Sequence, residues 1–136
     1  MEPSIYQYNQ PFTLECGVSL PKLKIAYHTY GSFVPGKPVA WVCHALTANS
    51  DVVDWWKGLV GEGSLINPDD YFIICANIIG SCYGSTGPLS VEDLGAEISL
   101  NNFPTLTIRD MVEAHILLRK HLGIEQIDLL MGGSMG

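Results

Sequence analysis

The sequence predicts an α/β protein with a mostly parallel sheet. Two early segments alternate between apolar and polar residues, which is typical of strands with one face in water. Two later segments are continuous apolar runs, as in strands buried on both faces. A helical segment with clear start and stop signals then leads into a further apolar run, which favours a right-handed strand–helix–strand crossover.

The alternating segments are residues 12–16, closed by Gly17, and residues 23–30, closed by Gly31. Alternation with a closing glycine predicts antiparallel strands at the edge of the sheet. Residues 35–38, Pro-Gly-Lys-Pro, predict a turn.

The continuous apolar runs are residues 39–43 and 71–76. Each is followed by a polar, irregular stretch. If these runs are parallel strands, their carboxyl ends face loops at the edge where α/β proteins bind ligands.

Residues 107–122 form the clearest predicted helix. Thr107 is placed to cap its start, with Asp110 three residues later in the position of a capping box. Apolar residues recur at helical spacing and Gly123 provides a stop signal. Residues 127–131 follow as a strand.

That last strand enters Gly132-Gly133-Ser134-Met135-Gly136, a Gly-x-Ser-x-Gly pattern. A strand leading into this pattern is the form of a nucleophile elbow, in which a sharp turn exposes the serine hydroxyl. Ser134 is therefore the candidate nucleophile. Serine needs a histidine base and an orienting carboxylate, and in elbow folds both follow the serine in the chain.

Acyl transfer also needs two donors for the transient oxyanion. One is the backbone N–H of the residue after the nucleophile, here Met135; the other comes from the loop after the third strand. If the alternating segments are strands one and two, residues 39–43 are the third strand, and the N–H of Leu46 is the second candidate donor. His44 precedes the serine and is interpreted as a loop-shaping residue.

One alternative to the nucleophile remains open for this turn, and a second is excluded by the sequence. Ser134 could be a polar residue of a tight turn, exposed to water and without a catalytic role. A phosphate-binding turn would need a Walker-type Gly-Lys-Ser/Thr, which the sequence lacks.

Other polar residues support weaker hypotheses. The glycine-rich stretch 77–88 is either a pocket wall or a plain surface loop, and Cys82 within it has no evident activating charge, so no catalytic role is expected. Asp51 and Asp54 are interpreted as a helix start. His28 and His115 are interpreted as structural residues, and no metal-ligand spacing is present.

The net charge of -7 argues against a nucleic-acid partner, because phosphate binding needs clustered Lys and Arg. No apolar run has the length of a membrane span, and no signal peptide is recognisable. The four cysteines show no Cys-x-x-Cys spacing. They could form two disulfides in a secreted protein, but without a targeting signal we expect a reduced, cytoplasmic chain.

Several passages together resemble the homoserine O-acetyltransferases of the α/β-hydrolase superfamily. They are Cys-His-Ala-Leu-Thr at 43–47, Asp-Trp-Trp at 54–56, the stretch 70–77, Cys-Tyr-Gly-Ser-Thr-Gly-Pro at 82–88, the stretch 107–112 and Gly-Gly-Ser-Met-Gly at 132–136. The chain departs mildly from the family's usual pattern at Ala48 and Ser81.

The resemblance implies an α/β-hydrolase fold and a ping-pong reaction of methionine biosynthesis. Ser134 would accept the acetyl group of acetyl-CoA and pass it to the hydroxyl of L-homoserine, with Leu46 and Met135 holding the oxyanion. It implies no bound cofactor and a cytoplasmic homodimer with an inserted helical lid.

The resemblance covers the family's N-terminal part, so residues 1–136 are expected to be the N-terminal part of one domain, without the lid, triad acid and histidine. Three functions stay open: O-acyl transfer to an amino acid, with an acetyl or succinyl donor and a homoserine or serine acceptor; ester hydrolysis; and a non-catalytic fragment. The chain alone is expected to be inactive and poorly soluble, or paired with its C-terminal portion.

Overall fold

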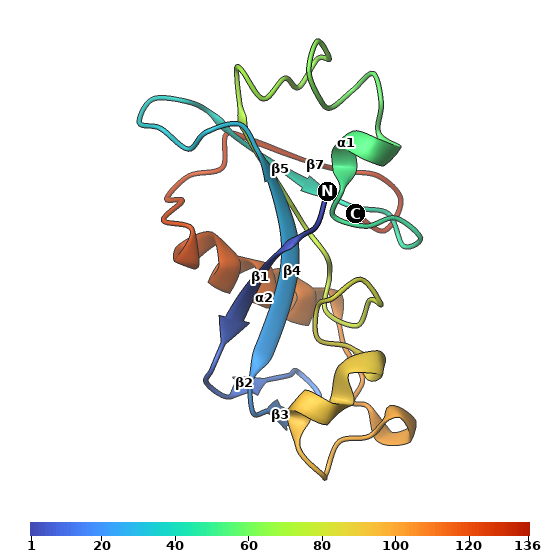
Figure 1. The fold of residues 1–136 in the computed structure, drawn as a ribbon. Helices are drawn as coiled ribbons and strands as arrows, with labels where there is room; N and C mark the ends of the chain where they lie inside the picture. The colour runs from blue at the N-terminus through green and yellow to red at the C-terminus, as the bar shows by residue number, and fades with distance from the viewer. The chain divides into compact units, whose positions relative to one another are not determined.

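A computed structural model describes all residues, 1–136. The chain divides into two compact units. The first contains Met1–Ser4, Tyr27–Ala76 and Ile124–Gly136, and the second contains Ile5–Ala26 and Asn77–Gly123. The larger sheet has the strand order β1-β4-β6-β5-β7, and a separate hairpin pairs β2 with β3. Figure 1 traces the chain from β1 to β7.

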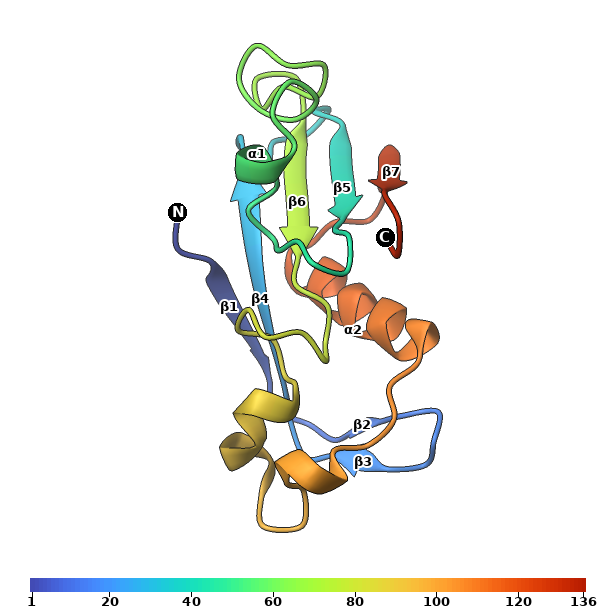
Figure 2. The same ribbon diagram turned by 90° about the vertical axis from the view of Figure 1, so that its right-hand side faces the viewer.

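In the first unit, the end of β4 (Leu23–Tyr30) pairs antiparallel with β6 (Phe72–Ala76). Strand β5 (Val39–Cys43) lies parallel to β6 and, on its other side, parallel to β7 (Leu129–Gly132). Figure 2 shows β5 and β6 pointing the same way and β4 pointing the opposite way. The predicted mixed sheet, antiparallel first and parallel later, is confirmed.

Both faces of β5 and β6 are buried, as their continuous apolar runs predict. Alternate residues of the two strands, together with residues of the chain between them, form one cluster: Ala40, Val42, Val52, Val60, Ile66, Ile73 and Cys75. The short helix α1 (Val52–Trp55) contributes Val52 to this cluster, and the stacked rings of Trp55 and Trp56 pack against it. The aromatic pair therefore covers part of this cluster.

The second unit contains α2 (Ile108–His121), the predicted helix. The Thr107 hydroxyl accepts a hydrogen bond from the Asp110 N–H, and the Asp110 carboxylate accepts one from the Thr107 N–H. This is the predicted capping box. Gly123 follows the helix with a φ of +73°, a conformation that favours glycine.

The predicted strand at 12–16 is largely wrong. Only β2 (Phe12–Thr13) is extended, and it pairs with β3 (Ser19–Leu20). The Leu14 carbonyl accepts from the Gly17 N–H, so the chain turns where the prediction continues the strand. The first strand of the large sheet is instead β1 (Ser4–Tyr8), which the prediction missed. By this route β5 is still the third strand of that sheet in chain order.

Two short 3₁₀ segments, Pro88–Leu94 and Leu100–Asn102, complete the second unit. The glycine-rich loop before them is bonded to β4 through side chains. The buried Ser85 hydroxyl accepts from the Ala26 N–H at 3.0 Å and donates to the Asn77 carbonyl at 2.6 Å. Thr86 and Lys24 exchange two further bonds, each of 2.8 Å. The segment is therefore an extension of the strand edge and not a loosely held surface loop.

Replacing Ser85 by Ala should destabilise the protein by about 1–3 kcal/mol, because a buried N–H and a buried carbonyl both lose their partner. Urea unfolding of the full-length protein measures this cost. Ser90→Ala is the matched control, since the Ser90 hydroxyl bonds only to the part-buried backbone of Gly87. Equal unfolding free energies for the two variants would contradict the role of Ser85.

Candidate active site

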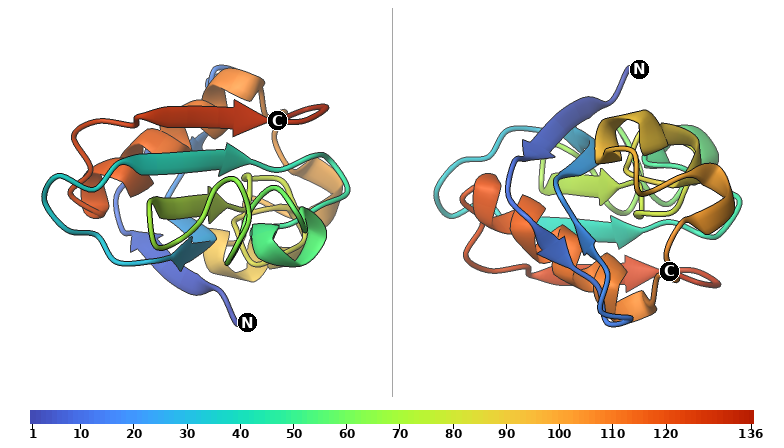
Figure 3. Two further views of the ribbon diagram at one scale, coloured as in Figure 1. Left: turned by 90° about the horizontal axis from the view of Figure 1, so that it is seen from above. Right: turned by 90° about the horizontal axis from the view of Figure 1, so that it is seen from below.

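Parallel pairing of β5 with β7 assembles the candidate site within the first unit. The register places Cys43 opposite Gly132, so both strands end together. Figure 3 shows the two strands side by side and pointing the same way. The loop that begins at His44 and the turn 132–136 therefore leave the sheet at one edge, as the sequence predicts.

The turn has the backbone of a strained elbow. Ser134 has a φ of +59° and is the one non-glycine residue with positive φ in the chain. A left-handed conformation costs a residue with a side chain roughly 1–2 kcal/mol. The turn is closed by a hydrogen bond of 3.0 Å from the Gly136 N–H to the Gly133 carbonyl. A turn that only needed solvation would avoid this strain with glycine, so the geometry favours the nucleophile.

The first and last glycines of the elbow are required by close backbone contacts. A Cβ on Gly132 would lie 3.0 Å from the Gly136 Cα and still nearer to the Gly136 carbonyl group. A Cβ on Gly136 would lie 2.7 Å from the Cys43 carbonyl carbon and 2.9 Å from the His44 carbonyl oxygen. The end of the elbow thus lies directly against the start of the loop that contains Leu46.

Leu46 and Met135 are the candidate oxyanion donors. Leu46 is 68% exposed, within a turn closed by a bond of 3.0 Å from the Ala48 N–H to the Ala45 carbonyl. Neither the Leu46 N–H nor the Met135 N–H donates to another group of the protein. Both amides are therefore available to an incoming ligand.

His44 shapes this loop. Its ring is buried, and Nδ1 lies 2.8 Å from the Ala45 carbonyl oxygen. Because a carbonyl oxygen can only accept, Nδ1 carries the hydrogen. This contact agrees with the predicted role of His44 in the loop.

The cysteines near the site are poor nucleophiles. Burial raises the pKa of the Cys43 thiol at the end of β5. Burial, with smaller contributions from the neighbouring Cys43 and Asp51, also raises the pKa of the Cys75 thiol. Both thiols stay neutral at physiological pH, which leaves Ser134 as the candidate nucleophile of this edge. Cys82 lies exposed in the second unit.

Asp51 has a role that the sequence did not reveal. It precedes α1, as predicted, but its side chain does not cap the helix. Its carboxylate instead accepts a hydrogen bond from Tyr30 on β4. His28, predicted to be a satisfied structural residue, bonds through both ring nitrogens, to Ser50 and to the Met1 carbonyl. The sequence signal for these contacts was the presence of polar side chains, His28 and Tyr30, on the predicted alternating strand 23–30.

No helix in the structure has both the length and the apolar character needed to cross a bilayer.

Comparison with known proteins decides the family. A family model described as the alpha/beta hydrolase fold matches residues 41–136, which include both the candidate oxyanion loop and the elbow. The chain belongs to the alpha/beta hydrolase fold family. This assignment agrees with the order of strands and with the strained serine at the end of β7.

Relatives within this family include both transferases and hydrolases. A homoserine O-acetyltransferase of Chlorobaculum parvum is 50% identical over 98% of the chain. The crystal structure of a homoserine O-acetyltransferase from Staphylococcus aureus matches with a TM-score of 0.78 and 31% identity, over 98% of this chain and 40% of that one. An acetylester hydrolase from Corynebacterium glutamicum matches with a TM-score of 0.82 and 29% identity, over 98% of this chain and 37% of that one.

The chain spans 38% of the length of the Chlorobaculum parvum relative. The identity to these relatives confirms the resemblance to homoserine O-acetyltransferases that was predicted from the sequence.

Replacing Gly136 by Ala should abolish most esterase or transferase activity, because the new Cβ would overlap the backbone of Cys43 and displace the elbow. Gly133→Ala is the matched control. Its Cβ would meet only the Trp56 ring, at an ordinary 3.7 Å, and Gly133 does not have positive φ. Hydrolysis of a chromogenic acetyl ester by the full-length protein measures the effect. Equal activity of the two variants would disprove the described packing.

Proposed function

We propose that the full-length protein transfers the acetyl group of acetyl-CoA to the side-chain hydroxyl of L-homoserine through an acetyl-Ser134 intermediate. The observation that carries the proposal is the strained Ser134 in a turn whose Gly136 lies against the start of the loop that contains Leu46. The proposed donors, the N–H groups of Leu46 and Met135, donate to no other group of the protein. The named function of relatives that are 40–50% identical to the chain supports the choice of reaction.

In the first half-reaction the Ser134 Oγ attacks the thioester carbonyl carbon as a base removes its proton. The carbonyl electrons move to oxygen, where the N–H groups of Leu46 and Met135 donate hydrogen bonds to the oxyanion. The C–S bond then breaks and CoA leaves as the thiol with the proton from the base. In the second half-reaction the homoserine hydroxyl attacks the acetyl ester, and Ser134 regains its hydrogen.

We place the base and its orienting acid outside the 136 residues. In elbow folds the acid and the histidine both follow the serine, and the chain spans 38% of the length of the Chlorobaculum parvum relative. Of the histidines in the first unit, His28 bonds through both ring nitrogens and His44 bonds the Ala45 carbonyl.

The remaining parts of the proposal concern partners and location. The substrates are small molecules, with acetyl-CoA as a consumed donor and no bound cofactor. The acidic charge argues against nucleic acid as a partner. We propose a cytoplasmic homodimer for the full-length protein, or a pairing of this chain with a separate C-terminal portion.

The second candidate function is ester hydrolysis with the same elbow. The match to an acetylester hydrolase at a TM-score of 0.82 favours it specifically. The two functions differ in what attacks the acetyl-serine. A transferase must admit the amino-acid hydroxyl and exclude water, whereas a hydrolase admits water.

Release of CoA from acetyl-CoA by the full-length protein should depend on L-homoserine, and Ser134→Ala should lower it by about 10³-fold or more, because the covalent step is lost. Thiol detection and the mass of acetylated protein measure both. Ser32→Ala, which removes an exposed hydroxyl in the same unit, is the control and should keep full activity. Steady CoA release without homoserine would favour the hydrolase. Faster reaction with succinyl-CoA or with L-serine would correct the donor or the acceptor.

The 136-residue chain alone should show no turnover and should associate with other chains. Strand β7 is the edge of the sheet, with Leu130 65% exposed, and an unpaired apolar edge favours aggregation. Sedimentation and an acetyl-transfer assay measure both properties. A monomer that unfolds cooperatively, or one that turns over acetyl-CoA, would contradict this prediction.

A further inference from the structure

The far end of the oxyanion loop is bonded more extensively than a connecting loop requires. We call residues Asn49, Ser50 and Asp51 the anchor. They end the segment that starts at His44, and they lie with the end of β4, with α1 and with β6 in the first unit. Each of the three residues forms hydrogen bonds to a residue outside the loop or within the anchor.

Ser50 is attached to β4 through His28. The Ser50 Oγ lies 2.7 Å from His28 Nδ1, and His28 Nε2 lies 2.9 Å from the Met1 carbonyl oxygen. A carbonyl oxygen only accepts, so Nε2 carries the ring hydrogen and Nδ1 accepts from the Ser50 hydroxyl. Both side chains are buried, with His28 5% and Ser50 1% exposed, so neither group can replace its partner with water without a structural change.

Asp51 is attached to β4 through Tyr30. The Tyr30 hydroxyl donates to Asp51 Oδ1 at 2.5 Å. Burial is the larger cause and the hydrogen bond to Asp51 the second cause of the raised pKa of Tyr30. The Tyr30 hydroxyl therefore keeps its hydrogen at neutral pH and can donate it. Burial alone would raise the pKa of Asp51, but hydrogen bonds from Tyr30 and the amino terminus outweigh it and lower that pKa. The pair is thus a charge-assisted hydrogen bond.

Asn49 connects the anchor to the rest of the unit. Its carbonyl accepts from the Trp55 indole N–H at 2.8 Å, and its side-chain oxygen accepts from the Asp51 N–H at 2.9 Å. The Cys75 thiol on β6 lies 3.9 Å from the same Asn49 carbonyl. The anchor therefore has partners on both a strand and a helix.

The partners on β4 are held by strand pairing and by contact with each other. His28 and Tyr30 lie two residues apart, so they project from the same face of the strand, and their rings are nearly parallel at 7°. Strand pairing fixes His28 opposite Cys75 and Tyr30 opposite Ile73. The middle of the loop is held much less, since Leu46 is exposed and its N–H makes no bond to the protein.

We propose that His28 and Tyr30 are positioning residues, which fix the Leu46 amide by holding Ser50 and Asp51. The proposal rests on the proposed function, because it assigns a purpose to the geometry of the oxyanion loop. A backbone donor must lie within a few tenths of an ångström of the developing charge, and a misplacement of about 1 Å costs up to 10²-fold in rate. Two attachments at one end of the loop and β5 at the other restrict the amide between them.

The test measures acylation of Ser134 apart from the choice of acceptor. The full-length protein is mixed with p-nitrophenyl acetate, and the burst of nitrophenolate reports formation of acetyl-serine. Tyr30→Phe removes only the hydroxyl that bonds Asp51, and His28→Ala removes the acceptor of the Ser50 hydroxyl. Each should lower the burst rate by about tenfold with little change in KM, because the loss is in transition-state stabilisation.

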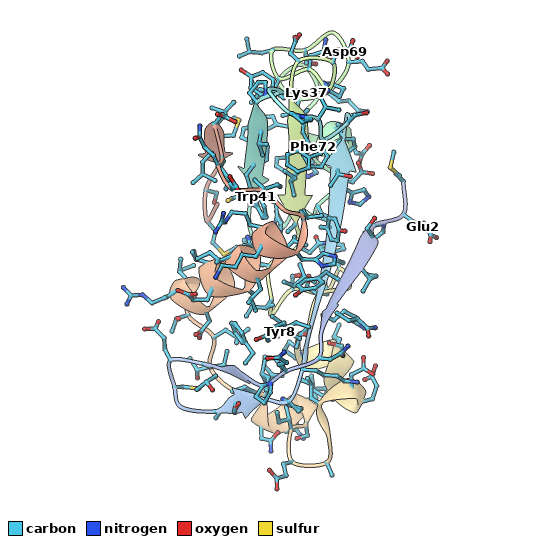
Figure 4. All side chains as sticks on the ribbon, turned by 90° about the vertical axis from the view of Figure 1, so that its left-hand side faces the viewer. Glu2, Tyr8, Lys37, Trp41, Asp69 and Phe72 are labelled. Carbon is cyan, nitrogen blue, oxygen red and sulfur yellow. The ribbon has the colours of Figure 1, made fainter.

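Two controls separate positioning from general stability. Lys37→Met removes a bond of 2.7 Å from the Lys37 ammonium to the Pro68 carbonyl in the same unit, where Figure 4 shows Lys37 near Asp69 at one end of the sheet. It should lower the free energy of unfolding and leave the burst rate unchanged. His28→Asn supplies an oxygen that can accept from Ser50, and it should restore much of the rate lost in His28→Ala.

The outcomes distinguish the two proposals. No burst in the wild type, or a full burst in Ser134→Ala, would overturn the proposed function. A normal wild-type burst together with wild-type rates in Tyr30→Phe and His28→Ala would overturn the positioning role. The Leu46 amide resonance in NMR spectra supplies a readout without activity: it should shift in both anchor variants and stay unchanged in Lys37→Met. An unshifted Leu46 resonance in the anchor variants also overturns the proposal, including where a variant is too unstable for kinetics.

Discussion

The parallel pairing of β5 and β7 is the constraint on which the candidate site depends. It makes Cys43 and Gly132 neighbours, so the candidate oxyanion loop and the turn at Ser134 emerge from the sheet at the same level. A shift of the register by one residue would move Ser134 by more than 3 Å along the strand and turn alternate side chains to the other face. Packing opposes such a shift, because it would take Leu129 and Met131 of β7 away from the core cluster against which they lie. Packing in the core thus sets the geometry of a site that contains few side chains.

Within that register, the elbow combines a strained residue with two residues that cannot have side chains. Ser134 holds a left-handed conformation, while Gly132 and Gly136 let the backbone pass within contact distance of itself and of Cys43. The free-energy cost of the backbone strain at Ser134 is small compared with the free energy gained by burying the side chains of β5 and β6. The fold can therefore tolerate the strain. Solved structures similar to this chain include one named as a homoserine O-acetyltransferase and one named as an acetylester hydrolase.

Local patterns predicted the parts of the fold that depend on local physics. The buried strand 39–43, the helix capped by Thr107 and the elbow all have signals within a few residues, and each is found where predicted or within two residues of it. The errors arise from distant partners. Strand β1 lacks a clear apolar run and is extended because it pairs with β4. Asp51 has the sequence position of a helix cap, yet Tyr30, 21 residues away, takes its carboxylate.

The candidate oxyanion donors are main-chain amides, and this has a consequence for how such sites diversify. The Leu46 side chain is largely exposed to solvent. It can therefore be replaced during evolution without loss of the backbone N–H that would donate to the oxyanion. Only proline removes that hydrogen, and otherwise only a displaced backbone can spoil the donor. An inventory of invariant side chains would therefore overlook this half of the site, whereas a comparison of backbone traces would detect it.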